Sequence, residues 1–366
     1  MRQSRTDKRI DERLLYVYLA TLVVGLVMIY STSSIIAESR FGSHLYFFRQ
    51  QLLWALLSVL LVVVISRLDL KRVAVYSVPA LLLTLVALAL VFLMPARNDA
   101  HRWLMLGPLT FQPSEVFKFV LVIYLAFSLS NRKRDIADLR QLLIPYAPLV
   151  GIGLLLILIE PDLGSTVVIF ATVLGIFFLA GARMKHLMTA FLPPAAAASA
   201  VVFVLGYKKD RILDYLAAIA DPLQGSYQAK QAALTLGAGG LLGTGLGEGR
   251  QKLFFLPYPH TDFIFAATGE EVGLFGLLVI LGLLFYILKR GLKIAYAQPD
   301  RFGYLLASGV TLSLFINVAV NVSVVTSLLP VTGLPLPFIS YGGSSLLMSS
   351  AAIGVLLNLS RRTVSS

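Results

Sequence analysis

The sequence predicts an all-α protein that crosses a lipid bilayer ten times, and this fold class follows from its composition and its hydropathy pattern. Of 366 residues, 57% are hydrophobic and only 14% are charged, and the mean hydropathy is +0.82. Soluble domains have about 45–50% apolar and about 25% charged residues. The composition therefore excludes a water-soluble enzyme and, despite the net charge of +12, a nucleic-acid-binding domain.

Ten apolar stretches are long enough to serve as membrane spans, for which about 20 residues are needed. Residues 1–13 form a polar tail before the first apolar stretch. This stretch is too long for the core of a signal peptide, so we expect it to be a retained membrane anchor. We expect residues 1–366 to form a single transmembrane domain. The predicted spans are residues 14–36, 51–66, 73–94, 113–130, 144–159, 165–181, 187–206, 263–288, 302–329 and 343–359.

The distribution of Lys and Arg predicts which side of the membrane each connection faces. With ten spans, the two termini and the connections on their side hold 20 Lys and Arg residues, and the four short connections on the other side hold 4. Cytoplasmic connections carry the excess of positive charge. We therefore expect both termini in the cytoplasm, and we interpret the basic runs as topology signals and not as a nucleic-acid surface.

The connection between the seventh and eighth spans, residues 207–262, is the large extracytoplasmic loop. Its length of about 56 residues leaves room for short helices, and loops of this length usually have a function. Seven of the thirteen residues from Gly237 to Gly249 are glycine. Glycine there allows the backbone to approach a headgroup or another helix closely.

Two pairs of charged residues lie inside predicted spans, where a charge is expensive and suggests a function. Glu115 and Lys118 are three positions apart and so share one helix face. They form either a structural pair or part of a site. Glu270 and Glu271 are adjacent and point in different directions, which leaves both a helix-packing role and a functional role open.

Two further carboxylates, Glu160 and Asp162, occupy a tight turn between spans that contains no cation of its own. Asp162 is suited to cap the helix that follows. Asp262 ends the long polar loop and begins an apolar helix, with aromatic residues on both sides of it. It is either a helix cap, with Thr261 as a competitor, or a general base whose pKa partial burial raises.

Several motifs then resemble one known family over nearly the whole chain. The sequence is similar to the SEDS family of bacterial membrane proteins, the group that contains FtsW and RodA, and within it more to the FtsW branch. The motifs are His101-Arg102-Trp103, Gln112-Pro113-Ser114-Glu115 with Lys118, Glu160-Pro161-Asp162-Leu163-Gly164-Ser165, His260-Thr261-Asp262-Phe263 with Gly269-Glu270-Glu271, and Gly333-Leu334-Pro335-Leu336-Pro337-Phe338-Ile339-Ser340-Tyr341-Gly342-Gly343.

The resemblance implies a peptidoglycan glycosyltransferase that polymerises lipid II at the outer face of the bacterial cytoplasmic membrane, for septal wall synthesis, and releases undecaprenyl pyrophosphate. An elongation polymerase of the RodA type is the alternative within the family. A lipid II flippase is the alternative from another class, and it would use the charges inside the spans as translocation groups. A non-catalytic scaffold for a transpeptidase is a third reading.

The resemblance also implies the site residues and partners. The family's essential acid falls on Asp262, and the candidates for substrate or pyrophosphate binding are Arg102, Gln112, Glu115, Lys118, Lys230, Gln231, Lys252, His260, Thr261 and Ser340. A divalent cation, Mg²⁺ or Mn²⁺, is a candidate cofactor. Expected partners are lipid II, undecaprenyl-linked glycan, a class B penicillin-binding transpeptidase and other divisome membrane proteins, with no nucleic acid.

The sequence departs from the family pattern at two positions. Tyr258 stands where the family often has Glu, so we expect no second carboxylate near Asp262. Asn317 stands where Gln is common. A single base favours an inverting displacement, because a retaining mechanism needs a second carboxylate as nucleophile.

Overall fold

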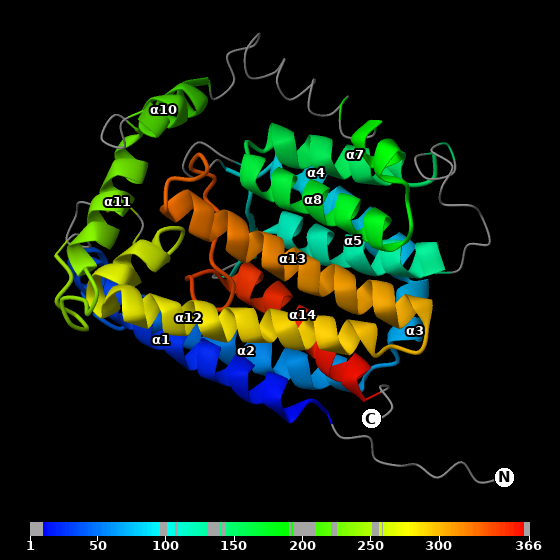
Figure 1. Ribbon diagram of the computed structural model, residues 1–366, viewed down its shortest axis with the longest axis horizontal. Helices are drawn as coiled ribbons and strands as arrows, with labels where there is room; N and C mark the ends of the chain where they lie inside the picture. Colours follow the sequence, from blue (N-terminus) through cyan, green and yellow to red (C-terminus); the bar gives the residue numbers. More distant parts are fainter. Residues whose placement is uncertain are drawn as a thin grey trace.

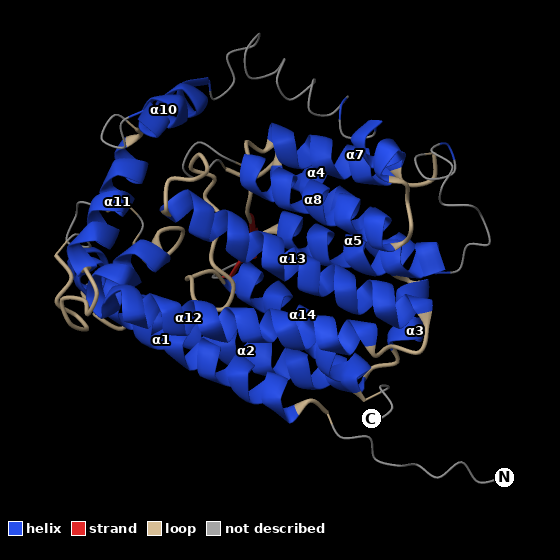
Figure 2. Ribbon diagram, viewed as in Figure 1, coloured by secondary structure: helices blue, strands red, loops and turns tan. Residues whose placement is uncertain are grey.

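The computed structural model describes residues 10–95, 101–106, 109–130, 140, 144–189, 192, 209–220, 225–250, 256–257 and 259–361. The chain forms a bundle of helices that run roughly side by side (Figures 1 and 2). Six helices are long and apolar enough to cross a membrane, which agrees with the predicted multi-pass membrane protein. They are α1 (Glu12–Phe41), α2 (Tyr46–Arg67), α5 (Pro113–Ser130), α12 (Ile264–Tyr296), α13 (Arg301–Val325) and α14 (Gly343–Ser360).

Three shorter apolar helices complete the described part of the bundle: α4 (Ser77–Val91), α7 (Ala147–Ile159) and α8 (Leu163–Leu179). The predicted third span, residues 73–94, is wrong in detail, because the chain first forms the short helix α3 (Leu70–Val75) and breaks at Tyr76. The predicted seventh span, residues 187–206, lies mostly outside the described residues, as do residues 1–9 of the tail.

The long loop contains two short helices, as its length predicted: α10 (Lys209–Ala220) and α11 (Tyr227–Gly239). The fold is not purely helical, because β1 (Leu104–Leu106) pairs antiparallel with β2 (Leu109–Phe111). This hairpin was not predicted. The dipeptide Gly107-Pro108 between the two strands was the available signal for a turn.

In the described part of the chain, five helices begin at a residue whose side chain accepts a hydrogen bond from a backbone N–H of the first turn, which explains where they start. The capping residues are Asp11 for α1, Asp69 for α3, Asp162 for α8, Ser226 for α11 and Asp300 for α13. The predicted capping role of Asp162 is therefore confirmed.

The last helix, α14, lies in the middle of the bundle, with 15 of its 18 residues buried. Small residues let it approach its neighbours closely, as expected when packing and not hydrophobicity holds helices together in lipid. Its main neighbour is α2: Gly354 packs on Ile65, and Gly343 packs on the ring of Trp54. The amide of Asn358 also donates to the carbonyl of Ile65 at 2.9 Å.

The start of α1 and the end of α14 meet at one end of the bundle. The backbone N–H of Asp11 donates to Ser360 Oγ at 3.0 Å, and the Asp11 carboxylate forms an ion pair with Arg290 of α12. The loops before α12 and α14 and the turn between α7 and α8 lie at the opposite end (Figure 1). That end gathers the motifs that the sequence singled out.

Candidate functional site

Asp262 lies in the last turn before α12, and its carboxylate faces the segment that joins α13 to α14. A Cβ added at Gly333 would lie 3.4 Å from Asp262 Oδ2, which places this glycine directly beside the carboxylate. Gly333 also has φ +76°, a conformation that favours glycine. Asn321 of α13 fixes both segments, because its amide donates to the carbonyls of Asp262 at 3.0 Å and Leu334 at 2.6 Å.

The residues before Asp262 are fastened to the same segment. Tyr341 N–H donates to the carbonyl of His260 at 2.9 Å, and Ser340 Oγ donates to the carbonyl of Thr261 at 2.7 Å. Ser340 Oγ also accepts from Leu336 N–H at 2.8 Å. Ser340 thus positions backbone around Asp262, which is the role that the structure gives to this candidate.

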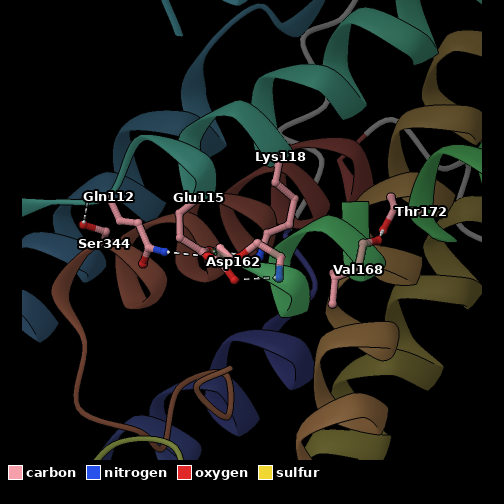
Figure 3. A network of polar contacts seen from close by, with 8 residues as sticks. Gln112, Glu115, Lys118, Asp162, Val168, Thr172 and Ser344 are labelled. Carbon is pink, nitrogen blue, oxygen red and sulfur yellow. Dashed lines mark hydrogen bonds and ion pairs between the residues drawn. The ribbon is translucent and has the colours of Figure 1, made fainter. Parts of the chain in front are cut away.

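The turn between α7 and α8 forms another wall of the site. Asp162 accepts hydrogen bonds from Ser165 N–H at 3.0 Å, from Ser165 Oγ at 2.8 Å and from Gln112 Nε2 at 3.3 Å (Figure 3). Gly164 packs against the segment that carries Gly333, since an added Cβ would lie 3.1 Å from the carbonyl of Thr332. Gln112 and the turn therefore reach the neighbourhood of Asp262.

Arg102 supplies the cation that the sequence of this turn lacks. It precedes β1, and its guanidinium donates to the carbonyl of Glu160 at 3.1 Å and to that of Pro161. Two of its five N–H donors thus bind the turn. Sequence reasoning missed this contact because 58 residues separate the partners.

Burial shifts the pKa of Asp262 toward the physiological range, and two neighbouring charges modify this shift. Burial raises the pKa of Asp262 to about 6; the charge of Arg102 opposes this rise and that of Asp162 adds to it. Burial, with a contribution from Asp162 and against that of Arg102, raises the pKa of Glu160 to about 8. The expectation that no second carboxylate lies near Asp262 is therefore wrong, because the charge of Asp162 in the α7–α8 turn reaches it. Ser165 and Gln112 bind the Asp162 carboxylate, so Asp262 stays the single proposed base.

His260 is buried and packs between aromatic rings. Its ring centroid lies 4.4 Å from that of Phe47 and 5.7 Å from that of Tyr341. Burial, and secondarily the charge of Arg40, lowers the pKa of His260 to about 4, so the ring is neutral at physiological pH. Its predicted contact with substrate stays a prediction.

Glu115 and Lys118 form a buried ion pair within α5. Lys118 Nζ lies 3.0 Å from Glu115 Oε1, and the two side chains are 3% and 9% exposed (Figure 3). The pair lines a cavity between α5, α13 and α14 together with Asn317 and Ser349. The geometry agrees with the structural reading of this pair, and its predicted role in substrate binding stays a prediction.

Glu270 and Glu271 bind other parts of the protein. Glu270 Oε1 accepts from Arg250 N–H at 2.7 Å, and Glu271 Oε2 accepts from Ser31 Oγ of α1. Both carboxylates thus hold neighbouring segments together. These contacts favour the helix-packing role over the translocation role that a flippase would require.

Two of the three candidates on the long loop lie in the described part of the chain, and no hydrogen bond or ion pair there joins them to Asp262. Lys230 and Gln231 lie on α11, partly buried, and Lys252 lies outside the described residues. In the described ranges, no group of three His, Asp or Glu side chains converges in a way that would hold a metal ion. The described residues thus offer no ready set of three protein ligands for a divalent cation, and we derive no step through one.

Three similarities to known proteins cover nearly the whole chain. The family described as "Cell cycle protein", comprising FtsW, RodA and SpoVE, matches residues 12–365. The "Probable peptidoglycan glycosyltransferase FtsW" of Geobacter sulfurreducens is 39% identical over 97% of this chain and 96% of the relative. The "Stage V sporulation protein E" of Bacillus subtilis is 38% identical over 96% of this chain and 97% of the relative.

Solved structures share the fold at similar coverage. A chain of a peptidoglycan synthase complex that coordinates polymerization and crosslinking has a TM-score of 0.79 and 30% identity, over 96% of this chain and 98% of that chain. The rod shape determining protein RodA of Thermus thermophilus has a TM-score of 0.71 and 28% identity, over 98% of each chain.

Proposed function

The chain belongs to the family of FtsW, RodA and SpoVE, and we propose from this premise that it is a peptidoglycan glycosyltransferase of the FtsW branch. It polymerises lipid II into glycan strands for septal wall synthesis. The FtsW branch is favoured because the relatives at 37–39% identity include several named FtsW. The observation that carries the catalytic assignment is the partly buried Asp262 beside Arg102, with a pKa raised to about 6.

Asp262 serves as the general base of this reaction. The 4-hydroxyl of the lipid II N-acetylglucosamine attacks C1 of the N-acetylmuramic acid at the end of the growing strand. The hydroxyl proton passes to the Asp262 carboxylate, a new C–O bond forms, and the bond from C1 to undecaprenyl pyrophosphate breaks. A base with a pKa near the working pH suits this transfer, and a single displacement inverts C1.

Arg102 assists the departure of the pyrophosphate. Positioned cations stabilise negative charge that develops on a leaving group. Within the described residues, the bonds of Arg102 to the α7–α8 turn use two of its five N–H donors. Gln112 supports this wall through Asp162. Lys252, Lys230, Gln231, His260 and Thr261, with the Glu115–Lys118 pair, are further proposed substrate-binding groups.

The topology that suits this activity has ten spans, cytoplasmic termini and the long loop outside the cell, between the seventh and eighth spans. Three observations support it: the bias of Lys and Arg, the meeting of Asp11 with Ser360 at one end, and the position at the other end of the loop that leads into α12 (Figure 1). The active site then opens on the extracytoplasmic face of the inner membrane. There it meets lipid II and the undecaprenyl-linked glycan.

A class B penicillin-binding transpeptidase is the proposed partner, together with other divisome membrane proteins. The support is the similarity to a chain of a peptidoglycan synthase complex that coordinates polymerization and crosslinking. Crosslinking needs a transpeptidase activity, and nothing in the described site of this chain supplies one.

The test is the formation of glycan strands from lipid II by the purified protein with its cognate transpeptidase. Asp262→Asn should lower the rate by about 10²–10⁴-fold, the usual contribution of a general base, and retain lipid II binding. Asp300→Asn is the matched control, because Asp300 caps α13 at the other end of the bundle. Full activity of Asp262→Asn would refute the assignment. An inert wild type that moves lipid II across sealed vesicles would favour the flippase.

A further inference from the structure

The glycine-rich segment after α11 completes the hydrogen bonds of a broken membrane helix. α12 is interrupted at Gly273, where φ is +64°. The N–H groups of Leu274 and Phe275 donate to the carbonyls of Gly240 at 3.0 Å and Leu241 at 3.3 Å. An irregular backbone at membrane depth is tolerated only where such groups find partners within the protein.

The same segment also binds the other side of the break. The N–H groups of Thr244 and Gly245 donate to the carbonyls of Glu270 at 2.9 Å and Glu271 at 3.0 Å. The glycines make this contact possible, since an added Cβ at Gly243 would lie 2.2 Å from the carbonyl oxygen of Glu271. The segment is therefore a fixed part of the bundle wall.

The apolar length of α12 indicates how deep this contact lies. Residues from Val272 to Leu288 are uncharged and almost entirely apolar, and Lys289 and Arg290 follow. A span needs about 20 residues, so the hydrocarbon region that ends at Leu288 begins near Gly269. At a rise of about 1.5 Å per residue, Leu274 lies about 7 Å inside that region.

The segment presents leucine side chains outward at this depth. Leu241, Leu242 and Leu246 are 61%, 81% and 60% exposed. Leu274 and Phe275 of α12, whose backbones bind this segment, are also exposed. The leucines thus extend the outward apolar face of α12. The end of the segment is polar, because Glu248 and Arg250 are exposed.

We propose that residues 240–247 form a membrane-immersed loop whose outward leucines contact the acyl chains of the leaflet on the Asp262 side. Glu248 and Arg250 then lie at the headgroups. Because these leucines continue the exposed apolar face of α12, we assign lipid, and not a protein, as the partner of this surface. The proposal concerns embedding and is independent of the chemistry at Asp262.

Cysteine accessibility tests the proposal, because the chain contains no cysteine. Leu242→Cys and the matched control Glu248→Cys are placed singly in the protein, purified alone and reconstituted in phospholipid nanodiscs. A membrane-impermeant maleimide should label Cys at position 242 at least about tenfold more slowly, because apolar surroundings disfavour the reactive thiolate. A bimane label at position 242 should be quenched more strongly by doxyl-labelled phospholipid than one at position 248.

Folding of both variants is verified by a monodisperse elution profile and by wild-type thermal unfolding. Equal labelling rates at the two positions, or equal quenching by doxyl lipid, would overturn the proposal. Protection of position 242 that arises only on addition of the transpeptidase would also overturn it and would assign the leucines to a protein interface.

Discussion

Glycan polymerisation should lose about 90% of its rate between pH 7 and pH 5. With a pKa of about 6, Asp262 is about 90% ionised at pH 7 and about 10% ionised at pH 5. With the ordinary aspartate value of 3.8, it would be almost fully ionised at both. The general-base role therefore predicts a decline in kcat/KM on the acid side, with a midpoint near pH 6.

Asp162→Asn changes this midpoint in a direction that the structure fixes. The charge of Asp162 raises the pKa of Asp262, so its removal should move the acid limb to lower pH. Because 1.36 kcal/mol equals one pKa unit, loss of a repulsion of about 1 kcal/mol lowers the pKa by somewhat less than one unit, and we expect a shift of at most about one unit. Asn retains helix-capping ability.

The assay is the initial rate of strand formation at subsaturating lipid II from pH 5 to pH 8. Asp69→Asn serves as the control, because Asp69 caps α3 at the opposite end of the bundle and its loss of charge should leave the profile unchanged. An unmoved acid limb in Asp162→Asn, or a shift to higher pH, would refute the electrostatic coupling between these two carboxylates.

Three further predictions concern the framework. Lys118→Ala should lower the free energy of unfolding by about 3–5 kcal/mol, because it leaves its glutamate partner buried without a counter-charge; a shift no larger than that of a surface lysine would contradict this. Gly273→Ala should lower the midpoint of thermal unfolding, because the residue has a positive φ and the added Cβ would lie 2.3 Å from a backbone nitrogen. Gly282→Ala, where the added Cβ meets open space, should not lower it. Equal midpoints for the two variants would count against the packing argument. Asn321→Ala should reduce kcat more than it weakens lipid II binding, because it removes the hydrogen bond to the carbonyl of Asp262. Asn358→Ala loses two hydrogen bonds remote from the site and should lower thermal stability alone.

Hydropathy predicted most of the bundle because an apolar stretch of span length has few alternatives to a helix. It predicted the third span less well, because the cap at Asp69 and the break at Tyr76 are local events within an apolar run. The hairpin of β1 and β2 was missed, since strands of three residues carry almost no periodicity.

The site was only partly predictable for a different reason. Asp262 stood out because it lies at the border of a polar loop and an apolar helix, with aromatic residues on both sides. Its coupling to Asp162 and Arg102 depends on segments far apart in the chain, which no local pattern links. Asn321 was missed because a single amide in an apolar helix gives no signal until its partners are known.

The packing of α14 against α2 has a consequence for biosynthesis. Asn358 binds the carbonyl of Ile65 across 293 residues of sequence. At a synthesis rate of about 5–20 residues per second, α14 is completed roughly 15 to 60 s after α2. During that interval the face of α2 around Trp54 and Ile65 has no α14 to cover it. A nascent chain that stalls or ends anywhere before α14 therefore leaves this face of α2 exposed to quality-control proteins.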